Sequence, residues 1–291
     1  MLPARFDYHR PSTLDEALSA LAEYGEDGKV LAGGMSLIPL MKLRFAAPAH
    51  LVDLNAVPGL AQVSEDGGML RVGALTRHAD LEDNGLLKSR YHAMAAAAPL
   101  ISDPLVRNRG TIGGSLAHAD PAGDWGSVMI AMRAKVAARS ASAEREIDVD
   151  DLLVDTFTSS LEPTEILTEV RIPSPSGPSG GAYLKLERKV GDFATVAVAV
   201  HVVMSNGHVG SAGIGLTAVG STNIRAADAE QALAGAEPSA EAFATAGKLA
   251  AAAANPVADQ RGSVEYKRNV VDVFVQRGLA QAVDIARSGR T

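Results

Sequence analysis

The sequence has 291 residues, of which 47% are hydrophobic, and a formal net charge of −7. This length exceeds that of a typical single domain, so we expect two or three compact units. The negative balance, with no dense stripe of lysine and arginine, argues against nucleic acid as a partner. No apolar run reaches the roughly 18 residues of a membrane span, and the first residues lack a secretory signal. We therefore expect a cytoplasmic protein without a transmembrane segment.

The chain contains no cysteine. This absence excludes thiol nucleophiles, redox disulfides, thiolate zinc sites and cysteine-ligated iron–sulfur clusters from this chain. Aromatic residues make up only 4% of the sequence, which disfavours a surface built for stacking nucleic-acid bases. Any electron chemistry in this chain must therefore use an organic cofactor.

The first 55 residues predict a small α/β unit. We expect a helix that begins at Thr13, where Glu16 completes a capping box, and that ends at Gly25. Its apolar residues repeat at helical spacing. The other elements predicted for this unit are, in order, a strand over residues 29–32, a helix from residue 37 and a strand over residues 50–54.

A second α/β unit is expected over residues 56–175. Asp66-Gly67-Gly68 predicts a hairpin turn, and Thr76 with Asp80 resembles the start of a helix. The alanine-rich stretch 86–100 predicts one continuous helix that prolines close. The remaining predicted elements are a helix over 124–132 and strands over 135–138, 145–149 and 165–172.

Residues 173–181 consist only of Pro, Ser and Gly and form the clearest boundary in the sequence. The unit that follows, residues 182–291, predicts a three-stranded antiparallel sheet, because Asn206-Gly207 is a strong hairpin signal between two apolar runs. The predicted strands cover 183–189, 194–204 and 209–219, and the predicted helices cover 226–233, 240–254 and 263–286. The whole chain therefore predicts an α+β fold.

Two glycine pairs, Gly33-Gly34 and Gly113-Gly114, follow short apolar segments. Glycine adopts positive φ without steric cost, so such a turn directs backbone N–H groups toward an anion. Neither pair matches the phosphate loop or the dinucleotide fingerprint, and one pair alone would be an ordinary turn. Two pairs, each followed closely by a hydroxyl from Ser36 or Ser115, suggest a site for a diphosphate.

Other motifs favour structural roles. The glycine-rich segment 210–220 lies in the returning arm of the predicted hairpin and not at a strand-to-helix turn. His118, Asp120 and Asp124 lack the spacing of a metal site, so we predict no metal. Neither serine beside the glycine pairs stands in a Gly-x-Ser-x-Gly motif, so we expect no catalytic nucleophile in this chain.

Four segments in this order are similar to a known family. They are Ala32-Gly-Gly-Met-Ser-Leu-Ile-Pro-Leu-Met-Lys-Leu-Arg44, Arg107-Asn-Arg-Gly-Thr-Ile-Gly-Gly-Ser115, Asp120-Pro-Ala-Gly-Asp124 and Asp259-Gln-Arg-Gly-Ser-Val-Glu-Tyr-Lys-Arg268. Together they resemble the flavin-binding medium subunit of the molybdenum hydroxylases, of the aerobic carbon monoxide dehydrogenase type within the xanthine dehydrogenase family. The resemblance covers nearly the whole chain. It implies two FAD-binding subdomains of the PCMH type over 1–55 and 56–175, and a C-terminal flavoprotein domain over 182–291.

The resemblance implies FAD as the cofactor, with its pyrophosphate held between the two glycine segments. In the family, an acidic residue at the position of Asp124 contacts the ribityl or ribose hydroxyls, with Asp120 as a second candidate. Lys185 matches a lysine that faces the flavin ring, and Phe193 matches a residue that shields one face of it. The residues expected to bind FAD are Ala32, Gly33, Gly34, Met35, Ser36, Leu37, Thr111, Ile112, Gly113, Gly114, Ser115, Asp120, Asp124, Ile166, Leu167, Lys185 and Phe193.

One residue departs from the pattern of the family. Relatives often carry His at the position of Met35, inside the first glycine segment. A thioether cannot donate a hydrogen bond, so a contact made by that imidazole is absent here or replaced by backbone. We expect FAD binding to survive, because backbone N–H groups supply most of the contacts.

The resemblance further implies an electron-transfer role within a heterotrimer. Such a subunit receives electrons from a small iron–sulfur subunit and passes them to a quinone, a nicotinamide or another external acceptor. The substrate is oxidised on a large molybdenum-cofactor subunit. We expect the assembly to be a dimer of heterotrimers, either free in the cytoplasm or associated with the inner face of the membrane. Two alternatives stay open, namely a self-contained flavin oxidoreductase and a flavin-less nucleotide-binding scaffold.

Overall fold

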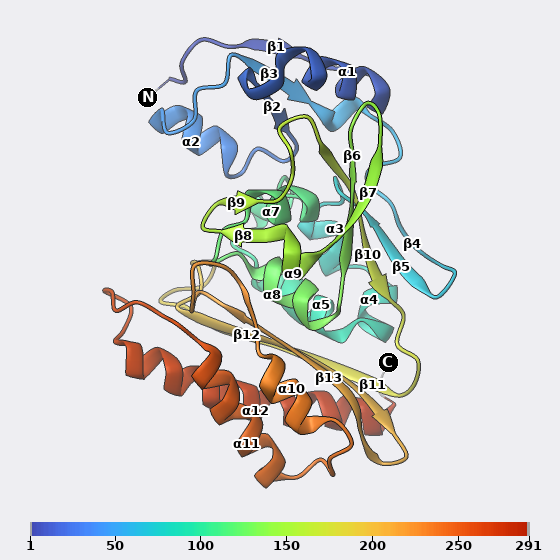
Figure 1. The fold of residues 1–291 in the computed structure, drawn as a ribbon, viewed down its shortest axis with the longest axis vertical. Helices are drawn as coiled ribbons and strands as arrows, with labels where there is room; N and C mark the ends of the chain where they lie inside the picture. Colours follow the sequence, from blue (N-terminus) through green and yellow to red (C-terminus); the bar gives the residue numbers. More distant parts are fainter. Residues whose placement is uncertain (1, 290–291) are drawn as a thin grey trace.

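The computed structural model describes residues 2–289, which form three layers stacked along the long axis of the molecule (Figure 1). The first layer carries a three-stranded sheet, the second a five-stranded sheet and the third a four-stranded sheet. A further two-stranded hairpin, β8–β9, lies beside the helices of the second layer. Among the described residues, no helix combines the length and the apolar character needed to cross a membrane.

The first layer is an α/β unit with a parallel sheet in the order β1-β3-β2. Thr13 caps α1 through its side chain, and Gly25 ends the helix, as the sequence predicts. The carboxylate of Glu16 accepts from the backbone N–H of Ser12, so the box closes one residue earlier than expected. The elements are β1 (Asp7–His9), α1 (Leu14–Tyr24), η1 (Gly25–Asp27), β2 (Gly28–Leu31), α2 (Leu37–Leu43), β3 (His50–Asp53) and η2 (Leu54–Ala56).

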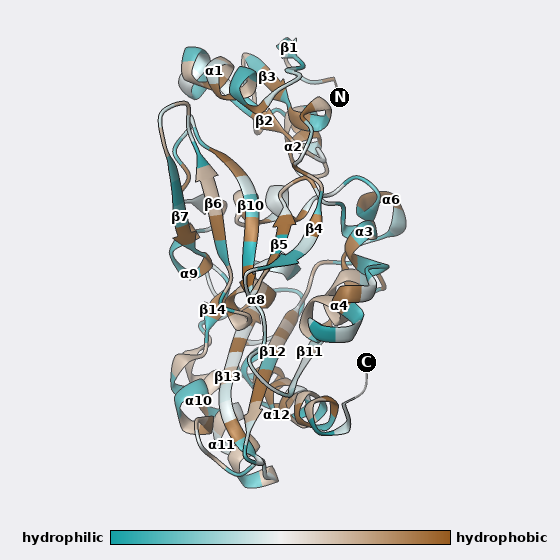
Figure 2. Cartoon of the chain, turned by 90° about the vertical axis from the view of Figure 1, so that its right-hand side faces the viewer, coloured by the Kyte–Doolittle hydropathy of each residue, from teal (hydrophilic) through white to brown (hydrophobic). Residues whose placement is uncertain are grey.

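The second layer is built on an antiparallel sheet in the order β4-β5-β10-β6-β7. These strands confirm the predicted ones within a few residues, and the edge strand β7 is mostly hydrophilic (Figure 2). The strands are β4 (Val63–Asp66), β5 (Met69–Gly73), β6 (Lys135–Arg139), β7 (Glu144–Asp148), β8 (Leu153–Asp155), β9 (Thr158–Ser159) and β10 (Ile166–Pro173).

Short helices cover this sheet and surround the buried indole of Trp125. Arg77, and not Thr76, is the N-cap of the first of them, because the Asp80 carboxylate accepts from the N–H of Arg77. The helices are α3 (His78–Glu82), α4 (Gly85–Arg90), α5 (His92–Ala97), η3 (Ala98–Leu100), α6 (Pro104–Arg107), α7 (Ile112–His118), α8 (Asp124–Ala131) and α9 (Val149–Leu152).

The continuous helix predicted over 86–100 is wrong, since α4, α5 and η3 divide this stretch. The break lies at Tyr91, whose backbone has φ −118° and ψ 57°. The side chain of Tyr91 is fully buried, and its hydroxyl donates to Glu65 at 2.8 Å and lies 2.9 Å from the Ser174 hydroxyl. Tertiary contacts of one side chain therefore overrule the alanine-rich helical pattern.

The third layer is an antiparallel sheet in the order β11-β12-β13-β14, with α12 packed along β11 and β12 (Figure 1). The predicted three strands are present, but the two-residue strand β14 adds a fourth. The strand predicted from Tyr183 begins at Ser179, inside the Pro/Ser/Gly run, because this segment pairs with β12. The elements are β11 (Ser179–Leu186), β12 (Val196–Ser205), β13 (His208–Thr217), β14 (Ile224–Arg225), α10 (Ala227–Leu233), α11 (Ala240–Ala253) and α12 (Val264–Ser288).

The glycine-rich segment lies on β13, in the returning arm of the hairpin, as predicted. The helix α8 of the second layer packs directly on this strand, and a side chain at Gly213 or Gly215 would overlap the backbone of that helix. The opposite side of the sheet is covered by α12. Both faces of the third sheet are therefore buried, and α8 carries residues of the second layer down to it.

Candidate cofactor site

The first glycine segment connects β2 to α2. Gly34 has φ 76°, and its carbonyl accepts from the N–H of Ile38 at 3.0 Å, which starts the helix. Within the described part of the chain, the backbone N–H groups of residues 34–37 donate to no protein acceptor. Met35 and Ser36 are exposed, and the Ser36 hydroxyl makes no capping bond. A row of free donors after a positive-φ glycine is a setting that binds an anion.

The second glycine segment differs from the expected turn. Gly113 and Gly114 lie in the first turn of α7 and have no positive φ, so the prediction of a second copy of the same turn is wrong. Their N–H groups are already used, since Gly114 donates to the Thr111 hydroxyl at 3.1 Å and Gly113 to the Ala74 carbonyl at 2.9 Å. These two glycines leave open the space that a side chain would fill, but they do not supply free N–H donors.

The two glycine segments nevertheless lie against each other. A Cβ atom on Gly33 would overlap the carbonyl of Arg109, and a Cβ atom on Gly114 would lie 3.6 Å from Cβ of Ala32. A small pocket of about 70 Å³ opens beside this contact. Among the predicted residues, those that line it are Ala32, Gly113, Gly114, Ile166 and Leu167.

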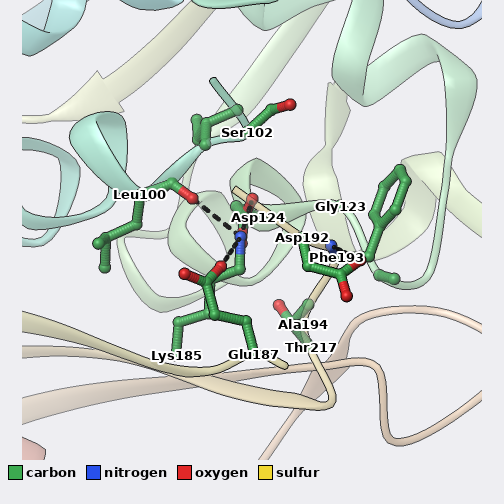
Figure 3. A network of polar contacts seen from close by, with 12 residues as sticks. Leu100, Ser102, Gly123, Asp124, Lys185, Glu187, Asp192, Phe193, Ala194 and Thr217 are labelled. Atoms are coloured by element: carbon green, nitrogen blue, oxygen red, sulfur yellow. Dashed lines mark hydrogen bonds and ion pairs between the residues drawn. The ribbon is translucent and has the colours of Figure 1, made fainter. Parts of the chain in front are cut away.

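Asp124 and Lys185 belong to a buried polar network between the second and third layers (Figure 3). The Nζ atom of Lys185 lies 3.1 Å from the Asp124 carboxylate and 3.6 Å from that of Glu187, and it donates to the Leu100 carbonyl at 2.9 Å. The Tyr183 hydroxyl donates to the other Asp124 oxygen at 2.6 Å. The side chains of Lys185 and Asp124 are 2% and 8% exposed.

Burial controls the titration of this network. It raises the pKa of Asp124, an effect that the nearby ammonium of Lys185 and the hydroxyl of Tyr183 partly oppose. Burial and the adjacent Asp124 carboxylate raise the pKa of Tyr183 well above its ordinary value. The ammonium of Lys185 is therefore committed to protein partners, while the phenol of Tyr183 stays a hydrogen-bond donor.

Sequence reasoning did not identify Tyr183 and Glu187 as members of the network. The signal was present, because Tyr183, Lys185 and Glu187 occupy alternate positions along one stretch, and alternate residues of a strand point to the same face. What the sequence does not show is that α8 brings Asp124 to that face.

Asp120 and Phe193 lie at a second, larger cavity of about 350 Å³ between the second and third layers. The Phe193 side chain is 56% exposed. Arg261, from the C-terminal motif, donates to the Phe193 carbonyl at 2.6 Å and to the Asp192 carboxylate at 3.1 Å. This arginine was not predicted as a site residue, and it holds the loop that carries Phe193.

The arrangement fits a large dinucleotide cofactor. Free N–H donors at 34–37 suit phosphate, and Gly114 leaves open the space that a side chain would fill. Ile166 and Leu167 line the same small pocket as Gly113 and Gly114 and add apolar surface to it. The buried network and Phe193 lie between the second and third layers, and Phe193 lines a different cavity. FAD, when bound, accepts one or two electrons and passes them on.

Comparison with known proteins agrees with this geometry. Residues 4–175 match the family described as the FAD-binding domain in molybdopterin dehydrogenase, and residues 181–282 match the CO dehydrogenase flavoprotein C-terminal domain. The chain therefore belongs to the FAD-binding family of molybdopterin dehydrogenases. Its cofactor is FAD, and the chain is a subunit of an oxidoreductase.

Relatives of the chain include carbon monoxide dehydrogenase medium chains and subunits of other dehydrogenases. The chain is 39% identical to the carbon monoxide dehydrogenase medium chain of Hydrogenophaga pseudoflava, over 97% of this chain and 98% of the relative. It is 40% identical to subunit alpha of the 6-hydroxypseudooxynicotine dehydrogenase complex of Paenarthrobacter nicotinovorans, over 99% and 97%. The solved carbon monoxide dehydrogenase from Hydrogenophaga pseudoflava superposes with a TM-score of 0.94 at 41% identity, covering 98% and 99%. The predicted α+β fold and the predicted cofactor are confirmed.

Proposed function

We propose that this chain is the electron-transfer subunit of a heterotrimeric molybdenum hydroxylase. In this role it takes electrons from the iron–sulfur clusters of a small subunit and delivers them to a quinone, a nicotinamide or another external acceptor. The absence of cysteine supports this division of labour, because the chain cannot ligate such a cluster itself. The full-length similarity to a medium chain and to a complex subunit supports it as well.

The observation that carries the proposal is the contact between the two glycine segments. We place the diphosphate of FAD there, with the N–H groups of residues 34–37 and the hydroxyls of Ser36 and Ser115 as donors. Ile166 and Leu167 form an apolar wall for the flavin, and Phe193 covers one face of the ring. Asp124 serves the ribityl or ribose hydroxyls, and its pairing with Lys185 fixes the direction of its carboxylate.

The proposal extends to the assembly of the complex. Each heterotrimer comprises this chain, the iron–sulfur cluster subunit and a large molybdenum-cofactor subunit. Within this chain, the FAD-binding subdomains cover 1–55 and 56–175, and the flavoprotein domain covers 182–291. Two such heterotrimers form the dimer, which works in the cytoplasm, at or near the inner face of the membrane. The two relatives are named for carbon monoxide and for 6-hydroxypseudooxynicotine, which supports one type of medium subunit serving different large subunits.

Purification of the complex tests the assignment. The complex is expected to be yellow, to release FAD on denaturation, and to contain a small iron–sulfur protein and a large molybdenum protein. The isolated chain is expected to show no oxidation of a small substrate with a dye acceptor. Full-rate substrate oxidation by the isolated chain would instead establish a self-contained flavin oxidoreductase.

Gly114→Val tests the diphosphate site. A side chain at this position would enter the gap beside Ala32 and Thr111, where the diphosphate is placed. We expect FAD content to fall to background, measured as flavin released per chain on denaturation. Gly85→Val, also in the first turn of a helix, is the control, because Gly85 has no positive φ and nothing lies within 4 Å of a Cβ there. Normal FAD content in folded Gly114→Val protein would remove the assignment.

A further inference from the structure

A pair of side chains connects the two glycine segments. Asn55 follows β3 in the first layer, and its amide donates to the carbonyl of Ala32 at 2.8 Å. Arg77 precedes α3 in the second layer, and its guanidinium donates to the carbonyl of Arg109 at 2.9 Å. The same guanidinium donates to the Oδ1 atom of Asn55 at 2.5 Å. The residue before the first glycine pair is therefore tied to the loop before the second.

The orientation of the Asn55 amide is fixed by its neighbours. Its Nδ2 atom donates to Ala32 and to the Asp53 carboxylate, and its backbone N–H donates to the same carboxylate oxygen at 2.8 Å. The other oxygen of Asp53 accepts from the hydroxyl of Tyr8. With both amide protons used, Oδ1 is left to accept from Arg77. Rotation of the Asn55 amide would break its side-chain contacts with Ala32, Asp53 and Arg77 together.

Backbone contacts leave little room for adjustment between the segments. The Cα atom of Gly33 packs on the backbone of Arg109 and Gly110, and Arg77 pairs with Thr111 as an isolated antiparallel bridge. The N–H of His78 donates to the Gly110 carbonyl at 3.1 Å. The segment 109–111 is thus held against Arg77 on one side and against Gly33 on the other.

Arginine suits this position because its planar guanidinium donates in two fixed directions at once. One direction reaches the side chain of Asn55 and the other reaches a backbone carbonyl. The ammonium of a lysine keeps the charge but lacks the fixed fork. Burial of Arg77 and the nearby charge of Arg109 lower the pKa of the Arg77 guanidinium. This environment is that of a hydrogen-bond donor held between two layers, and not that of a solvated cation.

We propose that Arg77 and Asn55 are positioning residues for FAD, which set the spacing between the two glycine segments without touching the cofactor. The inference rests on the proposed diphosphate site. If the spacing relaxes, the free donors at 34–37 and the open side of Gly114 no longer face the two ends of one diphosphate. Loss of the pair therefore weakens every ligand that carries this diphosphate.

Binding to the full chain stripped of FAD tests the inference. Dissociation constants for FAD and for ADP, which shares the adenosine diphosphate half, are measured for Arg77→Lys, Arg77→Gln, Asn55→Ala and the double variant Asn55→Ala/Arg77→Gln. The measurement uses a temperature at which each variant has the circular dichroism of the wild type. A residue that only stabilises the fold leaves the dissociation constants unchanged under this condition. Arg90→Gln is the matched control, because it removes an arginine of α4 that pairs with Glu65 of β4, away from the two glycine segments.

We expect the dissociation constants for FAD and ADP to rise by about tenfold or more in each single variant, and to stay unchanged in Arg90→Gln. Arg77→Lys is expected to be no better than Arg77→Gln, since the fork and not the charge is needed. The double variant is expected to be no weaker than the single ones, because both substitutions remove the same connection. Asn55→Ala gives an independent answer if a variant at Arg77 fails to fold.

Wild-type affinity in folded Arg77→Gln and Asn55→Ala would overturn the inference, and so would full recovery in Arg77→Lys, which would show that the charge acts directly. The two proposals fail in different ways. If Gly114→Val abolishes FAD binding while Arg77→Gln and Asn55→Ala bind normally, only the positioning role is lost. If Gly114→Val also binds FAD normally, the diphosphate site itself is misplaced.

Discussion

His78 is a buried, neutral residue beside the second glycine segment. Its backbone N–H donates to Gly110, and its Nδ1 atom accepts from the indole N–H of Trp125 at 3.0 Å. The residue is 5% exposed. Burial, together with the cations of Arg77 and Arg107, lowers the pKa of His78 to about 4. A histidine in this setting stabilises the fold only while its imidazole is neutral.

Acidification is therefore expected to destabilise the protein through His78. The unfolded chain takes up a proton near pH 6.5 and the folded chain only near pH 4, so stability falls as pH drops through this interval. Between pH 7.5 and pH 5 we expect a loss of about 2 kcal/mol from this residue. In His78→Gln, the free energy of unfolding, measured with denaturant at both pH values, is expected to lack this pH-dependent loss. An unchanged pH dependence would contradict the prediction, and the exposed His208→Gln serves as the control.

Met35 shows how little of the first glycine segment depends on its side chains. It is 37% exposed, and its thioether donates no hydrogen bond. The free donors at 34–37 are backbone groups, which are the same whatever residue stands at this position. A methionine at this position is therefore compatible with the segment holding a phosphate.

At the scale of elements, the junction of α4 and α5 is the clearest case of tertiary control. The hydroxyl of Tyr91 joins Glu65 of β4 and Ser174 after β10, and the Ser174 hydroxyl donates to the same Glu65 oxygen at 2.6 Å. Arg90 completes the cluster with an ion pair to Glu65. Three segments of the second layer thus meet at one phenol.

Tyr91→Phe is expected to lower the free energy of unfolding by about 1 to 2 kcal/mol. The substitution keeps the buried ring but removes the hydrogen bond that the charged Glu65 accepts from the phenol, while Ser174 and Arg90 stay as partners of Glu65. Urea unfolding of the FAD-free chain measures the change. Tyr266→Phe, at a side chain that is 47% exposed, should change stability by less than about 0.5 kcal/mol. Equal effects of the two substitutions would refute the role of the phenol.

At the scale of the whole molecule, the layers are joined by charged groups as well as by apolar packing. Lys185 lies on β11 of the third layer, whereas Asp124 begins α8 of the second, and Lys185 also reaches Leu100 at the end of η3. The three side chains of Asp124, Lys185 and Glu187 are all largely buried. An ion pair that is buried between layers is stable only while both the cation and the carboxylate are present.

Lys185→Met is therefore expected to destabilise the FAD-free chain by about 3 kcal/mol, since it leaves two buried carboxylates without their cation. The loss should be smaller at pH 5 than at pH 8, because burial raises the pKa of Asp124 and lower pH allows its carboxyl group to become neutral. Denaturant unfolding at the two pH values measures this. Lys88→Met is the control, since its partner Asp83 is exposed. A loss no greater than in the control would show that the network does not hold the layers together.

The sequence alone determined most of the elements and the identity of the cofactor. Period-2 and helical patterns, the cap at Thr13 and the turn at Asn206-Gly207 act locally, so they can be read without knowledge of distant contacts. The glycine segments predicted a diphosphate site, and their resemblance, with that of the C-terminal motif, to a flavin-binding family implied FAD. The absence of cysteine excluded a cluster from this chain.

Only the tertiary structure decided which residues meet at the two glycine segments. Glycine pairs that look alike in sequence differ, because Gly34 forms a turn with free donors while Gly113 and Gly114 begin a helix whose donors are already used. Asn55 and Arg77 lie in different layers and carry no local motif, so their connection exists only once β3 and α3 are packed together. The site is formed by contacts between residues that are distant in the sequence, and no pattern of neighbouring residues encodes such contacts.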